Sequence, residues 1–184
     1  MEEIKEQYNP FDKMTFTYDK CFLCGASLTD ENRSDEHIYP KWLQKMFNLW
    51  DKKLVLLNGT DISYKDLKIP CCKSCNGQMS MMFENPIKSA VSAGFDNFHS
   101  LDKNLLFLWL NKMSYGMLFK ELSLDVSRSE PEKGKIYSPE FLKEHQMQYM
   151  FLQTILTNAT YAGKPYSMLV FKIDPCDIEN YWAH

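Results

Sequence analysis

The chain of 184 residues carries a formal net charge of −3, with 45% hydrophobic and 24% charged residues. This length suits one domain or a small module joined to a helical body, and the composition is that of a globular protein. The charge excludes a strongly basic nucleic-acid binder, so any such contact is expected to be local. The first residues, MEEIKEQYNPFDK, do not form a signal peptide, and no apolar run approaches the roughly 20 residues of a membrane span. We therefore expect a cytoplasmic protein without membrane contact.

The first half of the chain shows the alternation and turn signals that are typical of short strands. Strands are expected over 15–21, 36–39, 54–57 and 62–69, with a short helix over 41–47. Pro40 suits the start of that helix, because its missing N–H has no partner there in any case. The turn signal Asn58-Gly59 separates the last two strands and predicts a β-hairpin.

The second half is mainly helical in pattern. Helices are expected from 72 or 76 into the early nineties, over 101–122 and from 138 to about 157, followed by a strand over 167–173. Pro86 is expected to kink or break the first of these helices, because proline cannot donate a backbone hydrogen bond. Residues 101–122 are apolar nearly all round, which predicts a central and largely buried helix. Ser138 before Pro139 is typical of a helix N-terminus.

Four of the six cysteines form two Cys-x-x-Cys pairs, Cys21/Cys24 and Cys72/Cys75. A two-residue gap lets both sulfurs of a pair reach one ion about 2.3 Å away. Because we expect no secretory signal, a structural Zn²⁺ site is expected in place of disulfides. Cys71 competes with Cys72 as a ligand, but the spacing to Cys75 favours Cys72. The alternative is a set of buried free thiols.

An acidic residue and a histidine, Glu36 and His37, stand side by side between the two cysteine pairs. Neighbouring residues on a strand point to opposite faces, so the pair can send a carboxylate to one side and an imidazole to the other. The zinc clamp is expected to bring Asn76 close, and carboxylate and amide oxygens suit Mg²⁺. His37 can then act as the general base on a water molecule. Taken alone, the stretch is equally typical of a solvated turn.

Together these motifs resemble the HNH endonucleases, the ββα-metal or His-Me finger group. The matching stretches are Cys21-x-x-Cys24, Glu36-His37-Ile38-Tyr39-Pro40 and Cys72-Lys73-Ser74-Cys75-Asn76. More narrowly, EHIYPKWL over 36–43 with CKSCNGQMS over 72–80 is similar to a bacterial and phage subgroup of this family. The resemblance covers about residues 21–85, which is under half of the chain.

The resemblance implies that His37 is the general base, that Glu36 and Asn76 hold a catalytic Mg²⁺ or Mn²⁺, and that the four cysteines hold Zn²⁺. The chain also departs from the family, because the asparagine in the middle of the family's motif has no clear counterpart here. Asp66 lies nearest to that position, one residue out of step, and Asn58 is a more distant candidate.

The remaining candidate supporting residues are Glu84, which matches an acidic residue that follows in the subgroup, and Lys73. The stretch 33–90 carries nine basic and six acidic residues, so a local basic face is available for phosphate contacts. A solvated surface is the ordinary alternative for any one of these lysines.

The expected fold is α+β, with a zinc-clamped ββα-metal core and a mainly helical C-terminal body. Its parts are an N-terminal segment over 1–20, the HNH core over 21–95 and a helical body of unknown role over 96–184. The expected function is metal-dependent hydrolysis of phosphodiester bonds, with DNA favoured over RNA as the partner. The resemblance also implies a component of a phage-defence or mobile-element system. The helical body could be a specificity module, a surface for a homodimer or a docking site for a partner protein of such a defence system. The alternative is a non-catalytic zinc module that binds nucleic acid or protein.

Overall fold

The computed structural model describes residues 8–122, 124–157 and 166–172, and the structural statements below concern these residues. The fold is mixed α/β, about half helical, with two small antiparallel sheets. One sheet pairs β1 (Glu36–His37) with β4 (Lys68–Ile69), and the other pairs β2 (Lys53–Val55) with β3 (Asp61–Ser63). The helices are α1 (Lys41–Met46), α2 (Lys73–Met79), α3 (Asn85–Ala93), α4 (Phe95–His99), α5 (Lys103–Glu121), α6 (Pro139–Glu144) and α7 (Gln146–Thr157).

The expected hairpin is confirmed, but its second strand is not continuous. In β2 and β3, Leu54 lies opposite Ile62, on either side of the predicted turn. The 3₁₀ turn η1 (Tyr64–Asp66) then redirects the chain, so the remainder of the predicted strand becomes β4 and pairs with β1. There His37 lies opposite Lys68. The predicted strand 62–69 therefore serves two separate sheets.

The helix that starts after Cys72 runs on through a π turn, η2 (Ser80–Glu84), into α3. Pro86 lies at the start of α3 and cannot donate to the carbonyl four residues before it, at Met82. A wider π turn at this point accommodates the missing hydrogen bond. The expected disturbance at Pro86 thus appears as a π turn rather than a break.

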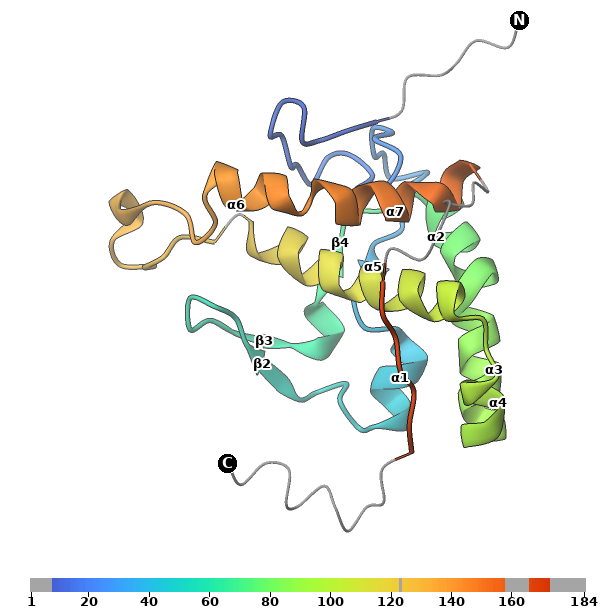
Figure 1. Cartoon of the computed structure of the whole chain (residues 1–184). Coiled ribbons are helices and arrows are strands. Elements are labelled where there is room, and N and C mark those ends of the chain that lie inside the picture. Colours follow the sequence, from blue (N-terminus) through green and yellow to red (C-terminus); the bar gives the residue numbers. More distant parts are fainter. Residues whose placement is uncertain (1–7, 123, 158–165, 173–184) are drawn as a thin grey trace, which may run out of the picture.

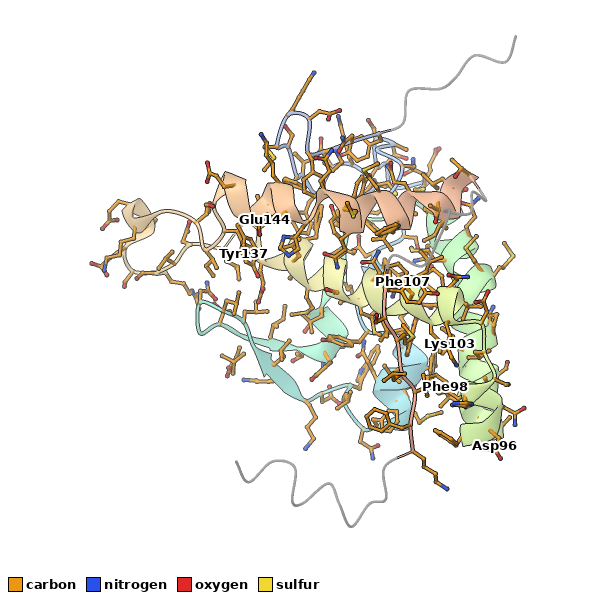
Figure 2. The ribbon with its side chains drawn as sticks, in the orientation of Figure 1. Asp96, Phe98, Lys103, Phe107, Tyr137 and Glu144 are labelled. Carbon is orange, nitrogen blue, oxygen red and sulfur yellow. The ribbon has the colours of Figure 1, made fainter. Side chains whose placement is uncertain are left out.

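The predicted central helix is α5, which runs alongside α7 in the opposite direction across the middle of the molecule (Figure 1). Figure 2 labels Phe107 on α5, whose ring lies 5.5 Å from that of Phe151 on α7. Towards the other end of α5, Tyr115 stacks against Phe22 of the first cysteine loop. Gly116 lets the helix approach Ile38, directly after β1, because a Cβ there would lie 3.1 Å from the Ile38 side chain.

Three predictions for the periphery need correction. The expected strand over 15–21 is irregular and forms only an isolated bridge between Lys20 and Ser27. The expected strand over 167–173 has no strand pairing in residues 167–172, and Ile173 lies outside the described residues. The single helix expected from 138 to about 157 is divided at His145 into α6 and α7.

The predicted N-terminus of α6 is confirmed, since the Ser138 side chain accepts a hydrogen bond from the backbone N–H of Phe141 at 3.2 Å. Within the described part of the chain, none of the helices combines the length and the hydrophobicity that a bilayer crossing requires.

Candidate functional site

The four predicted cysteines gather in one place. The sulfur atoms of Cys21, Cys24, Cys72 and Cys75 all lie within 4.8 Å of one another. Those of Cys24 and Cys72 are 3.8 Å apart, close to the separation of two thiolates on one tetrahedral Zn²⁺ at about 2.3 Å each. Three of the four side chains are buried, as in a closed structural site. The donor set therefore fits zinc.

Local backbone geometry explains why Cys72 and not Cys71 belongs to this set. Cys72 is the N-cap of α2, and its sulfur accepts from the backbone N–H of Cys75 at 3.5 Å. The first helical turn therefore aims both sulfurs of the pair in one direction. The Cys71 thiol is also buried and lies 4.0 Å from the sulfur of Cys21, but it points to the carbonyl of Cys72. Cys72, which the spacing favours, is thus the one grouped with the other three cysteines.

The first pair sits in a tight loop that closes on itself. The backbone N–H of Gly25 donates to the carbonyl of Cys21 at 2.9 Å, and Gly25 has a φ of 72°, a conformation that favours glycine. The N–H of Phe22 donates to the carbonyl of Pro70 at 2.8 Å, directly after β4. The cysteine cluster therefore fixes this loop to the point where β4 leads into α2.

Crowding of the thiols makes a cation favourable at their centre. Hydrogen bonding with Cys24, Cys71 and Cys75 lowers the pKa of the Cys21 thiol. Hydrogen bonding to Cys21 raises the pKa of Cys75, with burial adding to the effect. One thiolate can thus form at the expense of its neighbours, whereas four thiolates need a positive ion to balance them.

The two residues of β1 face opposite directions, as predicted. Glu36 points inward and is only 5% exposed, whereas His37 is half-buried. The His37 ring stacks on that of Trp50, with 6.1 Å between ring centroids. Its Nε2 atom is buried and has no hydrogen-bond partner among the described residues. Burial, and then the charges of Lys41 and Lys68, lower the pKa of His37 to about 4, so the imidazole is neutral at pH 7.

A residue that the sequence interpretation missed, Lys112 of α5, meets the inward face of β1. Its ammonium is fully buried and donates to Glu36 Oε1 at 2.6 Å, to the carbonyl of His37 at 3.0 Å and to that of Ile38 at 3.2 Å. Glu84 Oε1 lies 3.0 Å away as an ion pair. The sequence did contain a signal for this contact. A lysine in the middle of a helix that is apolar nearly all round predicts a buried acidic partner, because a buried charge requires one.

This ammonium changes what Glu36 can do. Burial raises the pKa of Glu36 against the opposing charge of Lys112. Burial disfavours the charged form of Lys112, but Glu36 and Glu84 outweigh it and raise the pKa of Lys112. Removing one partner from such a buried group typically costs about 3–5 kcal/mol, because the other charge is left uncompensated.

Asn76 lies on α2, and its side-chain nitrogen donates to Ser34 Oγ at 3.1 Å. Glu36, two residues after Ser34, points away from Asn76 and binds the ammonium of Lys112. The donor set of Glu36 and Asn76, as it lies, does not fit a divalent ion, because the carboxylate is buried and already neutralised by an ammonium. The Mg²⁺ or Mn²⁺ site remains a prediction.

The supporting candidates lie in different places. Glu84 is brought beside Glu36 through Lys112. Lys73 donates to the carbonyl of Glu31 at 2.5 Å and ties the loop before β1 to α2. Asp66 is exposed at the end of η1. Asn58 accepts from the N–H of Thr60 within the hairpin turn, so it supports the turn and not the site.

The surface around His37 is rich in lysines. Lys41 and Lys68 lie close enough to act on its pKa, and neither forms an ion pair with another described residue. Lys45 lies 5.9 Å from the centre of the Trp50 ring. An open depression of about 540 Å³ adjoins Trp50 and is lined by Gln44, Lys45, Asn48, Trp50, Asp51 and Lys52.

No family model, curated protein or solved structure matches the chain. The structure itself shows a mixed α/β fold and a cluster of four cysteines that could hold a metal ion.

Proposed function

We propose that this protein is a nuclease of the HNH type that hydrolyses phosphodiester bonds, with DNA as its substrate and His37 as its general base. The order β1, β4, α2 supports a ββα core, with α1 and the hairpin inserted between its strands. The observation that carries the proposal is His37 itself, a neutral, half-buried imidazole on β1 between Lys41 and Lys68, two cations without partners among the described residues.

In this proposal, a backbone phosphate binds near Lys41 and Lys68. The negative phosphate opposes the effect of the lysines and moves the pKa of His37 upward, towards the range in which a general base is effective. The imidazole then takes a proton from water as the water oxygen attacks phosphorus. The bond from phosphorus to the leaving oxygen breaks, and that oxygen takes up a proton from solvent, to which the imidazolium afterwards releases its own. The lysine charges stabilise the additional negative charge that develops on the phosphate.

The Zn²⁺ of the cysteine cluster would hold the Cys21 loop, β4 and α2 together and so support β1 from one side. The family resemblance also implies a catalytic Mg²⁺ or Mn²⁺. Because Glu36 and Asn76 do not fit such an ion as they lie, no step of the mechanism is assigned to it.

The test is cleavage by the zinc-loaded full chain of supercoiled plasmid, linear duplex, single-stranded DNA and RNA, each with Mg²⁺, with Mn²⁺ and without either. His37→Ala should reduce the rate by about 10²–10⁴, the usual contribution of a general base. His99→Ala, at an exposed position on α4, is the matched control and should cleave like the wild type. Undiminished cleavage by His37→Ala refutes the role of His37, and an inactive wild type refutes the nuclease.

A second candidate function is a non-catalytic zinc module that binds nucleic acid. The observation that favours it is the burial of Glu36 against Lys112, a structural use of the motif. Tight, salt-dependent binding of an oligonucleotide, with no cleavage of any substrate under any of the metal conditions, would support the module instead.

A further inference from the structure

The ammonium of Lys112 occupies a complete cage of oxygen atoms. A lysine has three N–H donors. All three are used here, on the carboxylate of Glu36 and on two consecutive backbone carbonyls, those of His37 and Ile38. The second carboxylate, Glu84, lies within ion-pair distance, and its Oε1 atom has no hydrogen-bond partner among the described residues.

Hard oxygen donors of this kind, carboxylates and backbone carbonyls, are those that divalent cations also use. Here the cation is part of the protein: it is the ammonium of Lys112 on α5, 76 positions after Glu36 in the sequence. An ion added at Glu36 would share that carboxylate with a positive charge that already lies 2.6 Å from it. Coulomb repulsion is strong in such a buried place.

The same ammonium holds the backbone that carries His37. Its hydrogen bonds to the carbonyls of His37 and Ile38 fix both peptide units that follow the histidine Cα. The ring itself stacks on that of Trp50. The orientation of the imidazole therefore depends on α5 as well as on the sheet.

We propose that Lys112 is the resident cation of the Glu36–Glu84 carboxylate pair, so that it occupies the carboxylate which the sequence assigns, together with Asn76, to Mg²⁺ or Mn²⁺. We also propose that it is a positioning residue for His37. The first part concerns cation binding and stands without any catalytic activity. The second part rests on the proposed nuclease function.

The first test is Mn²⁺ binding to the zinc-loaded full chain, followed by electron paramagnetic resonance. If Lys112 fills the cation position, Glu36→Gln leaves the Mn²⁺ affinity of the wild type unchanged. Lys112→Ala should bind Mn²⁺ at least tenfold more tightly than the wild type, and adding Glu36→Gln should abolish that gain. A wild-type Mn²⁺ site that is lost in Glu36→Gln overturns the proposal. This comparison remains decisive even if Lys112→Ala does not fold.

The second test concerns position and uses Lys112→Met, with Lys120→Met as the control on the same helix. Lys120 lies 5.8 Å from the ring of Tyr18, and among the described residues no hydrogen bond or ion pair joins it to β1. Folding is checked by circular dichroism, and Lys112→Met/Glu36→Gln is used if the single variant is unfolded. The imidazole resonances of His37 should shift in the Lys112 variant alone, and its kcat should fall at least tenfold with KM changed less than twofold. Unchanged resonances in a folded variant overturn the positioning role, whereas an inactive wild type refutes only the nuclease.

Discussion

Gly116 on α5 gives a sharp test of how closely this helix must approach β1. In Gly116→Ala the new Cβ would lie 3.1 Å from two side-chain carbons of Ile38, closer than an ordinary van der Waals contact. Ile38 cannot move away easily. Its side chain is fully buried, its N–H donates to the carbonyl of Leu67 at 3.0 Å, and its own carbonyl accepts from Lys112.

The change in the free energy of unfolding in Gly116→Ala is the difference between two effects. Overpacking a well-packed core costs about 1–3 kcal/mol, whereas replacing a helical glycine by alanine gains up to about 1 kcal/mol. We expect Gly116→Ala to lower the free energy of unfolding by about 1 kcal/mol, which is a fall in Tm of about 2–4 °C for a chain of this size. Gly77 on α2 is the matched control, because a Cβ there meets nothing within 4 Å. Gly77→Ala should therefore raise the stability by about 0.5–1 kcal/mol.

The assay is urea unfolding of zinc-loaded protein, with a double-mutant cycle through Ile38→Ala. Ile38→Ala alone should destabilise strongly, but in that background Gly116→Ala should gain about 1 kcal/mol, because the obstructing side chain is gone. If Gly116→Ala stabilises the wild type as much as Gly77→Ala does, the close contact between α5 and β1 is refuted.

Two further predictions concern the cysteine cluster and the imidazole. Cys72→Ser should lose zinc, measured by mass spectrometry of the metal content, and should melt at a lower temperature, whereas Cys71→Ser should retain one zinc per chain. The His37 imidazole should titrate near pH 4 by NMR in the zinc-loaded protein, and Lys41→Gln should raise this midpoint. Because the unfolded chain takes up this proton first, His37 makes the fold less stable as the pH falls from about 6.5 towards 4.

Each of these predictions has a clear contrary result. Zinc lost from Cys71→Ser and kept by Cys72→Ser would mean that the ligand set is wrong. A His37 midpoint at or above its ordinary value would show that burial and the lysines do not act on it as described. Lys143→Gln on α6 is the control for charge, since Lys143 is not among the charges that shift the pKa of His37.

Local chemistry explains which features could be predicted from the sequence. The choice of Cys72 over Cys71 follows from the geometry of one helical turn, and the hairpin follows from the turn at Asn58-Gly59. Ser138 as an N-cap is equally local. Such features depend on residues a few positions apart, and residues that are close in the sequence are also close in the fold.

The partner of Glu36 could not be found in this way. Lys112 is 76 positions away, and only the packing of α5 against β1 decides that its ammonium reaches this carboxylate. The same holds for β4, which pairs with β1 because η1 turns the chain out of the hairpin. The residues next to Glu36 in the sequence favour a role for Glu36 as a metal ligand. The cation that competes with the metal belongs to a helix far away in the sequence.

The long separation between Glu36 and Lys112 also has a consequence during protein synthesis. Chains are made from the N-terminus, so both cysteine pairs and β1 leave the ribosome before α5 does. A nascent chain that ends before Lys103 has all four clustered cysteines but no ammonium for Glu36. The cysteine cluster can therefore be completed in a partly made chain while the carboxylate of Glu36 still lacks its cation.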